Sequence, residues 1–282
     1  IRDLVREDGL SVKDFILPIF VVEGEKIKRE ISSLKGNYHW SVDRLGELVK
    51  ELKETGVRSV IIFGVPEHKD CKGTEAYNEN GIVQKAIRKL RELDDELYII
   101  TDVCMCEYTN HGHCGILHGK SIDNDETLEY LGKIALSHAK AGAHMIAPSD
   151  MMDGRIGYIR KVLDDNGFKM TPIMSYAAKY ASGFYGPFRE AAGSAPQFGD
   201  RKGYQMDPAN SREAMLEIEA DINEGADIIM VKPAMSYLDI VREARNRYDV
   251  PLCVYNVSGE YAMVKNAGEA GLIDEKRVAL EM

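Results

Sequence analysis

Three cysteines stand close together in the middle of the chain, at Cys104, Cys106 and Cys114. Thiolates are preferred ligands of zinc, and the spacing C-x-C-x7-C differs from the paired C-x-x-C knuckles of structural zinc sites. Three thiolates without an evident fourth ligand leave one coordination position open, as in a catalytic zinc site. The cluster therefore predicts a thiolate zinc site that takes part in chemistry.

Two other interpretations of the cysteines stay open. His111, His113 and His118 lie nearby in the sequence, so one of them could close a structural Cys3His site. The cysteines could also be buried without a metal, but residues that follow a strand end are seldom part of a core.

Two lysines occupy similar places after apolar runs. Lys232 directly follows the run ADIIMV, and Lys179 lies three residues past another run. Burial and mutual repulsion would lower the pKa of both amines, and a neutral amine attacks carbonyl carbons to form a Schiff base. One such lysine would more often be a solvated surface charge, whereas two at successive strand ends favour a shared pocket.

The longest stretch without periodicity runs from residue 183 to residue 206 and contains five glycines and two prolines. Loops longer than about 12 to 15 residues in a compact domain are usually lids, binding loops or disordered inserts. Arg189 and Arg201 lie in this stretch and could hold a carboxylate in bidentate fashion. We expect an active-site lid; the alternative is a surface insertion with surface arginines.

The elements that must position these residues alternate between strands and helices. Apolar runs typical of strands are each followed by helical periodicity, which predicts a parallel sheet. We expect one α/β domain over residues 1–282, a TIM (β/α)8 barrel whose last strand lies beyond Met282. The strands are expected at Phe15–Val22, Val57–Val65, Leu97–Cys104, Ala143–Pro148, Met170–Tyr176, Ala226–Val231 and Pro251–Val257.

A doubly wound open sheet is the alternative fold. No G-x-G-x-x-G follows the first strand, and reactive residues follow several different strands, as they do at the C-terminal face of a barrel. Side chains two residues apart point to the same side of a strand. Three sets are therefore expected to face one axis: Asp102 with Cys104 and Cys106, Ser175 with Ala177 and Lys179, and Met230 with Lys232.

The composition limits the partners of the protein. There are 46 acidic and 36 basic residues, for a net charge of −10, whose field would repel nucleic acids and anionic lipid surfaces. No apolar run approaches the roughly 20 residues that cross a bilayer, and no signal-peptide pattern opens the chain. We expect a cytoplasmic enzyme that acts on a small molecule and binds neither nucleic acid nor membrane.

Five long motifs are distributed along nearly the whole chain: DVCMCEYTNHGHCG, APSDMMDGRIGYIR, SYAAKYASGFYGPFREAAGSAPQFGDRKGYQMDP, MVKPAMSYLDIVR and YNVSGEYAM. Together they resemble the porphobilinogen synthase (5-aminolevulinate dehydratase) family. The resemblance implies a TIM-barrel lyase that condenses two 5-aminolevulinate molecules into porphobilinogen with loss of two waters, in tetrapyrrole (heme) biosynthesis. It also implies a homo-octamer with allosteric behaviour in some members.

The resemblance also implies residue roles. Lys232 matches the Schiff-base lysine of the substrate that becomes the propionate side of the product, and Lys179 matches the other. Cys104, Cys106 and Cys114 match the ligands of the zinc-dependent branch. The remaining matches are Arg189, Arg201 and Gln205 for the acetate-side substrate, Ser258 for the propionate-side carboxylate, Asp102 and Ser149 as polar lining, and Glu217 for an allosteric magnesium ion.

Two features of the family are not visible in this sequence. One is a further C-terminal strand with a tyrosine that binds the propionate-side carboxylate, and the other is an N-terminal arm that wraps a neighbouring subunit. Two rival functions stay open from the residues alone. A class I aldolase needs one barrel lysine and no zinc, and a barrel-shaped binding protein could carry a structural metal cluster. The order of C–C and C–N bond formation is not encoded in these motifs.

Overall fold

The computed structural model describes residues 1–282 and contains seven parallel strands, each paired with the next one along the chain. Hydrogen bonding joins β1, β4, β5 and β8 in one sheet and β9, β10 and β11 in another, and a bridge between Ile146 and Ile173 links β8 to β9. The strands are β1 (Ile16–Val22), β4 (Ser59–Val65), β5 (Tyr98–Val103), β8 (Met145–Pro148), β9 (Met174–Lys179), β10 (Ile228–Lys232) and β11 (Leu252–Val254).

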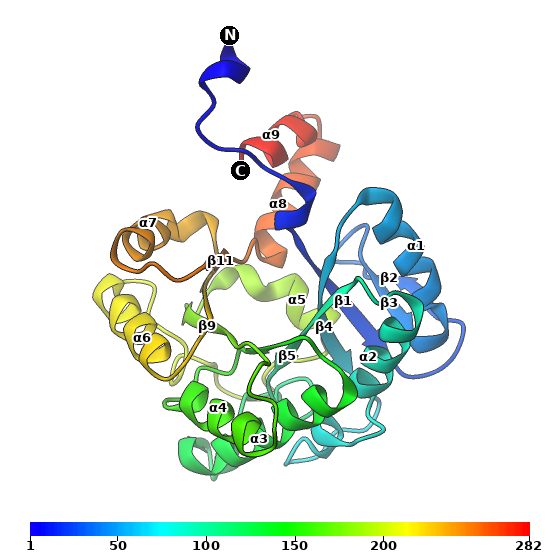
Figure 1. Ribbon diagram of the computed structural model, residues 1–282, viewed down its shortest axis with the longest axis vertical. Coiled ribbons are helices and arrows are strands. Elements are labelled where there is room, and N and C mark those ends of the chain that lie inside the picture. Colours follow the sequence, from blue (N-terminus) through cyan, green and yellow to red (C-terminus); the bar gives the residue numbers. More distant parts are fainter.

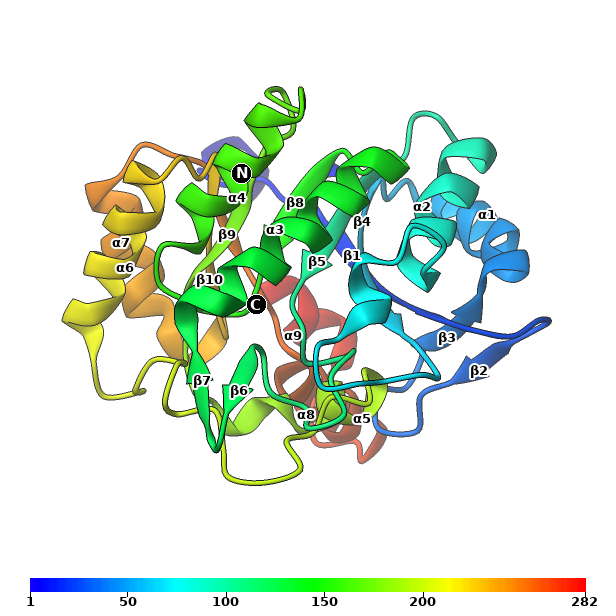
Figure 2. The ribbon, with the colours of Figure 1, turned by 90° about the horizontal axis from the view of Figure 1, so that it is seen from below.

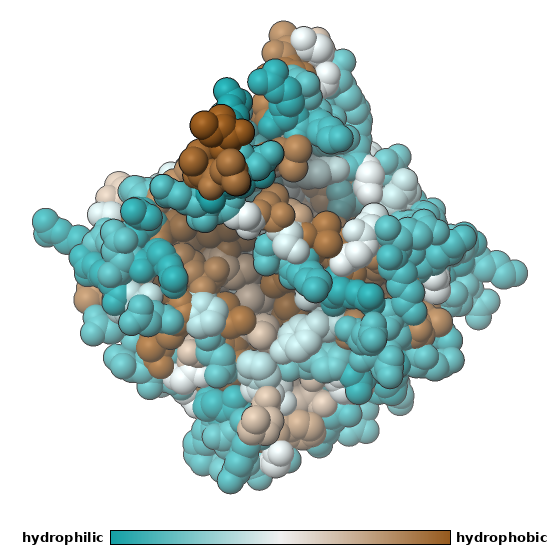
Figure 3. Space-filling view, turned by 45° about the horizontal axis from the view of Figure 1, so that its top comes forward, coloured by the Kyte–Doolittle hydropathy of each residue, from teal (hydrophilic) through white to brown (hydrophobic).

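This order confirms the barrel and excludes the doubly wound sheet, because a doubly wound sheet reverses its strand order in the middle. No pairing joins β11 to β1, so the barrel is not closed. In a view tilted toward the side that carries α8 and the two termini, the surface is hollowed and the hollow is lined largely by hydrophobic side chains (Figure 3).

Helices surround the strands (Figure 1). The first helix, α1, shows why they form. Its buried stripe consists of Leu45, Leu48, Val49 and Leu52, and Gly56 ends it in the left-handed conformation. The helices are α1 (Leu45–Thr55), α2 (Ile82–Leu93), α3 (Asn124–Ala141), α4 (Arg155–Asp165), α5 (Gly186–Ala191), α6 (Ser211–Asn223), α7 (Leu238–Arg247), α8 (Ser258–Glu269) and α9 (Glu275–Glu281). None of them is both long enough and apolar enough to cross a membrane.

Four short strands were not expected from the sequence. β2 (Lys28–Glu30) pairs antiparallel with β3 (Tyr38–Ser41), which continues the sheet beside β1. β6 (Ile116–His118) and β7 (Ser121–Asp123) form a hairpin that projects near the end of the barrel where α5 and α8 lie (Figure 2). These strands have only three or four residues, too few for a recognisable alternation of apolar and polar side chains.

All seven parallel strands of the barrel were predicted, and the bounds of β9 and β11 differ most from the expected ones. β9 begins at Met174 instead of Met170, whose side chain is 92% exposed, and it continues to Lys179. β11 keeps only three residues of the expected Pro251–Val257. Pro172 lies two residues into the first run and Pro251 opens the second. A proline cannot donate a ladder hydrogen bond, and hydropathy alone does not register that loss.

The core has two layers. The larger cluster lies between the strands and the helices and includes Leu48, Ile87, Leu131 and Ile159. A smaller cluster fills the barrel itself. Its side chains come from alternate positions of successive strands, as expected for a packed barrel interior. The interior positions include Phe20, Ile61, Phe63, Ile100, Met145, Ala147, Met174, Tyr176 and Met230.

Candidate active site

Lys179 and Lys232 are the last residues of β9 and β10 and lie directly opposite each other in the strand pairing. Their residues are only 5% and 4% exposed. The carboxyl ends of parallel barrel strands lie on the face where barrel enzymes hold their catalytic residues. The structure therefore brings both predicted lysines together at this face.

The predicted parity of β9 was wrong, and a β-bulge is the reason. Ser175 was expected to share a face with Lys179, but its hydroxyl bonds to Arg155 and Asp221 outside the barrel. The pairing of β9 with β10 shifts register between Ile229 and Val231, which inserts one extra residue into β9. The shift turns Lys179 inward, onto the side of Tyr176.

Aromatic rings surround the amine of Lys232. Its Nζ lies 4.1 Å from the centre of the Tyr255 ring and 5.0 Å from the centres of the Tyr176 and Phe188 rings. Burial, followed by the charge of Lys179, lowers the pKa of Lys232 to about 7. A large fraction of this amine is therefore neutral near pH 7, as the sequence predicted for a nucleophilic lysine.

Asp102 and Ser149 both lie beside the lysines. The Nζ of Lys179 donates a hydrogen bond to the main-chain carbonyl of Ser149. Burial, followed by the charge of Glu107, raises the pKa of Asp102 to about 8. One carboxylate oxygen of Asp102 is buried without a hydrogen-bond partner. The pair of lysines thus faces a carboxyl group that can hold a proton at neutral pH.

The three cysteines form one buried cluster. Their sulfur atoms all lie within 4.8 Å of one another, with Cys104 Sγ 3.4 Å from Cys106 Sγ. Hydrogen bonds from Cys104 and Cys106 lower the pKa of the Cys114 thiol well below its ordinary value. Three converging sulfurs, one of them prone to ionise, form a possible metal-binding cluster whose donor atoms suit a soft or borderline ion such as zinc.

None of the three nearby histidines joins this cluster. His118 is exposed on β6, where it bonds to Glu126. His111 accepts a hydrogen bond from the main-chain N–H of His113, and the ring of His113 contacts Tyr204 and the main-chain carbonyl of Phe198. The structure therefore disfavours the closed Cys3His site and leaves the three sulfurs without an imidazole ligand.

The segment 183–206 covers this end of the barrel and carries three predicted contacts. It includes a helix, α5, that the sequence did not suggest, because a single proline- and glycine-bounded turn has no visible periodicity. Arg201 is buried and donates to the main-chain carbonyl of Gly112 at 2.9 Å. Both polar atoms of the Gln205 amide and Nε of Arg189 are buried without partners.

Two further predicted residues lie on α8 and α6, and Ser258 lines a cavity together with Lys232 and Tyr255. The hydroxyl of Ser258 accepts a hydrogen bond from the main-chain N–H of Phe188 at 2.9 Å, at the contact between α5 and α8. Glu217 is half-buried on α6, outside the barrel, where burial and the charge of Asp221 raise its pKa. It does not take part in the lysine pocket.

Sequence reasoning missed three groups in this pocket. Tyr176 lies with its ring beside both lysine amines and its hydroxyl without a partner. Tyr255 lies against Lys232, and Glu107 is a buried carboxyl that accepts a hydrogen bond from Cys106 Sγ at 3.3 Å. Their positions directly beside recognised residues, in MSYAAK, VYN and CMCE, were the available signal.

The arrangement as a whole is equipped for carbonyl chemistry. A neutral amine can attack a ketone, and a second amine lies beside it. Buried polar groups without partners are rare in folded proteins, and here Asp102, Tyr176, Arg189 and Gln205 all carry one. Such groups can be satisfied by a polar ligand that enters the pocket.

Comparison with known proteins gives one consistent result. The family model described as delta-aminolevulinic acid dehydratase matches residues 1–282. A delta-aminolevulinic acid dehydratase of Bacillus subtilis (strain 168) is 54% identical over 281 residues, covering 100% of this chain and 87% of the relative. One from Methanothermus sociabilis is 55% identical over 276 residues, covering 98% and 86%.

A solved structure is also closely similar. The crystal structure of delta-aminolevulinic acid dehydratase (porphobilinogen synthase) from Toxoplasma gondii ME49, in complex with the reaction product porphobilinogen, superposes with a TM-score of 0.97. The two sequences are 42% identical, and the match covers 99% of this chain and 81% of the other.

Proposed function

This chain belongs to the delta-aminolevulinic acid dehydratase family, and from that premise we propose how its residues carry out the reaction. Its activity is that of a lyase, which condenses two 5-aminolevulinate molecules into porphobilinogen with loss of two waters. The observation that carries the residue assignment is the pairing of Lys179 with Lys232 in one buried pocket.

Each lysine amine forms an imine with the ketone of one substrate molecule. Lys232 holds the substrate that becomes the propionate side of porphobilinogen, and Lys179 holds the other. The lowered pKa of Lys232 supports this role, because the neutral amine is the nucleophile. Each imine withdraws electrons, so a proton next to it can be removed to give the enamine that forms the new bond. Asp102 and Ser149 line the pocket.

Residues of segment 183–206 bind the acetate-side substrate. We assign this role to Arg189, Arg201 and Gln205, whose side chains include buried polar atoms without partners. Arginine forks match the geometry of a carboxylate. Ser258 contacts the carboxylate of the propionate-side substrate. Segment 183–206 acts as a lid, because it covers the strand ends and would keep water from the imines.

Cys104, Cys106 and Cys114 hold a zinc ion, as in the zinc-dependent branch of the family. Three sulfurs within 4.8 Å of one another match the soft donors and open geometry of a catalytic site. When bound, zinc would supply a Lewis acid that activates the second substrate. The chain's own part is to fix that ion beside the lysine pocket, with Asp102 on the strand that leads to Cys104.

Glu217 is proposed to form an allosteric site that binds a magnesium ion. Glu217 lies close to two further carboxylates, Asp153 and Asp221, whose charges raise its pKa after burial does. Carboxylate oxygens are the ligands that magnesium prefers. We further propose that residues 1–282 act as one catalytic domain, that the enzyme works as a homo-octamer in the cytoplasm, and that it binds neither nucleic acid nor membrane.

Borohydride trapping tests the lysine assignment. The protein is incubated with 5-aminolevulinate, reduced, and digested for mass spectrometry. Adducts are expected on Lys179 and Lys232 and not on Lys169, an exposed lysine that serves as the internal control. An adduct on one lysine alone would favour an aldolase-like reaction. No adduct on either lysine would support a binding protein and contradict the proposal.

Metal removal tests the zinc assignment. A chelator is expected to abolish turnover while the far-ultraviolet circular dichroism stays largely unchanged, because strands and helices do not depend on the cluster. Added zinc should restore turnover, whereas magnesium alone should not. Global unfolding on chelation would instead support a structural metal.

A further inference from the structure

The predicted lid rests on the same loop that supplies Cys114. The main-chain N–H of Gln197 donates to the carbonyl of His111 at 3.0 Å, and Nη2 of Arg201 donates to the carbonyl of Gly112 at 2.9 Å. Two hydrogen bonds therefore join segment 195–204 to loop 111–114.

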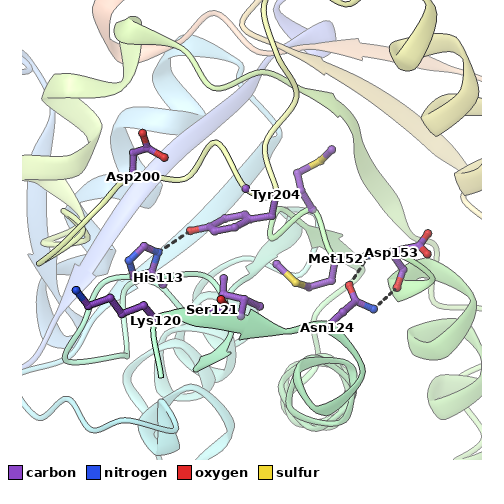
Figure 4. A pocket seen from close by; sticks show the side chains of 11 residues that line it. His113, Lys120, Ser121, Asn124, Met152, Asp153, Asp200 and Tyr204 are labelled. Carbon is purple, nitrogen blue, oxygen red and sulfur yellow. Dashed lines mark hydrogen bonds between the residues drawn. The ribbon is translucent and has the colours of Figure 1, made fainter. Parts of the chain in front are cut away.

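Tyr204 and His113 make the closest link between this contact and the cysteine cluster. His113 Nε2 lies 3.0 Å from the carbonyl oxygen of Phe198, which can only accept, so Nε2 carries the hydrogen. In the neutral ring Nδ1 is then an acceptor, and the Tyr204 hydroxyl donates to it at 3.2 Å. Figure 4 shows this hydroxyl pointing at the imidazole, at the wall of a cavity of about 460 Å³.

The same hydroxyl also contacts loop 111–114 directly. The main-chain N–H of Cys114 donates to the Tyr204 oxygen at 3.4 Å, and the Tyr204 side chain packs against the three cysteines. Among partly buried hydrophobic side chains, Tyr204 is the one that packs against the cluster. Tyr204 thus connects the lid to a sulfur-bearing residue through one side chain.

The three cysteines come from two separately held pieces of chain. Cys104 and Cys106 immediately follow β5, whereas Cys114 lies on the loop beneath the lid. A metal bound by all three would cross-link that loop to the end of β5 and fix the surface on which the lid rests. Within the loop itself, Thr109 Oγ1 donates a hydrogen bond to the carbonyl of His113 at 2.9 Å.

We propose that Tyr204, oriented by His113, is a positioning residue that couples metal binding at the three cysteines to closure of the 183–206 lid. The inference rests on the metal site of the proposed function. Because coupling between two sites is reciprocal, a filled metal site stabilises the closed lid and a closed lid tightens metal binding. Groups that orient metal ligands typically change metal affinity 10- to 100-fold.

Gly112 provides an independent way to disturb the same contact. Its φ is +71°, and a Cβ at this position would lie 2.3 Å from the carbonyl oxygen of Ala195 in the lid. An alanine here would strain the loop backbone and push the lid away, but it would remove neither a metal ligand nor the side chain of Tyr204. Gly112→Ala should therefore weaken the coupling by a route that does not involve Tyr204.

Hydrogen–deuterium exchange and Cd2+ titration test the coupling. Metal-free protein is titrated with Cd2+, and the absorbance of the cadmium–thiolate bonds reports binding. Hydrogen–deuterium exchange of the amides in residues 194–206 is measured with and without Cd2+. In the wild type, Cd2+ should slow this exchange about tenfold or more, within the usual range of coupling between sites. Tyr204→Phe and Gly112→Ala should lose most of the slowing and bind Cd2+ about tenfold more weakly.

Tyr158→Phe is the matched control, because Tyr158 is a partly exposed tyrosine on α4. It should behave as the wild type in both measurements. Wild-type exchange that does not respond to bound Cd2+, or a Tyr204→Phe variant with unchanged affinity and slowing, would overturn the coupling while leaving the metal site intact. A wild type that takes up no Cd2+ would overturn the metal site itself and this inference with it, and lysine trapping would still judge the rest of the proposed function.

Discussion

At the scale of residues, the chemistry of this protein is concentrated in a few buried polar groups. Lys232 lies among the rings of Tyr176, Phe188 and Tyr255, with Lys179 beside it. Removal of water by the rings and repulsion between the amines both disfavour the charged form of Lys232. The pocket therefore favours the neutral, nucleophilic form of this amine at neutral pH.

The pH dependence of imine formation follows from this environment. Only the neutral amine reacts, and the pKa of Lys232 is lowered to about 7 from an ordinary 10.5. The rate of adduct formation on Lys232 should therefore rise about tenfold per pH unit at low pH and level off above about pH 7. Samples taken at each pH and quenched under one fixed borohydride condition would measure it. A rate that still rises between pH 8 and pH 10 would contradict the lowered pKa.

At the scale of elements, one bulge and one close backbone contact shape the pocket. The bulge in β9 turns Lys179 inward beside Tyr176. At the other side, the start of α8 lies against the beginning of the lid, where a Cβ added at Gly259 would be 2.5 Å from the carbonyl oxygen of Phe184. This contact places Ser258 beside the main chain of Phe188.

Gly259→Ala should separate these two elements. The added methyl group meets backbone, which cannot move aside as a flexible side chain would, so the free energy of unfolding should fall by about 1–3 kcal/mol. Turnover should fall as well, because the lid begins at this contact. Gly186→Ala is the control, since no atom lies within 4 Å of its added Cβ. Chemical denaturation would measure the free energy of unfolding of both variants. Equal values for Gly259→Ala and Gly186→Ala would contradict the close contact.

At the scale of the whole molecule, a buried arginine ties the outer helices to the barrel. Arg155 on α4 is 2% exposed and pairs with Asp221 on α6. It also donates to the hydroxyl of Ser175 at 3.0 Å and to the carbonyl of Tyr176 at 3.2 Å, both in β9. One side chain thus holds two helices and the strand that carries Lys179.

Arg155→Met should leave Asp221 buried without its cationic partner. Breaking a buried ion pair on one side costs about 3–5 kcal/mol, so the free energy of unfolding should fall by that amount. Lys161→Met removes a surface ion pair with Asp165 and should change it by less than about 1 kcal/mol. Urea denaturation of both variants would compare them. Similar losses in the two variants would show that the buried network is not a major source of stability.

The sequence by itself determined the parallel α/β architecture, because that fold class follows from local periodicity. Seven apolar runs separated by helical stripes require a parallel sheet, and all seven became strands. It also indicated the cysteine cluster and the two lysines, since residues at the carboxyl ends of successive barrel strands must share one face. The long motifs indicated the family, and the match of the family model to residues 1–282 confirms it.

Only the tertiary structure decided how the side chains face. The bulge in β9 depends on pairing with β10, which no local pattern in MSYAAK records, so the predicted parity of Ser175 and Lys179 was wrong. The rings around Lys232 come from segments far apart in the chain. The hydrogen bonds of His113 to Phe198 and Tyr204 likewise join segments about 90 residues apart. Contacts of this kind depend on how distant elements pack, whereas hydrophobic periodicity reports only the preference of each element for a buried face.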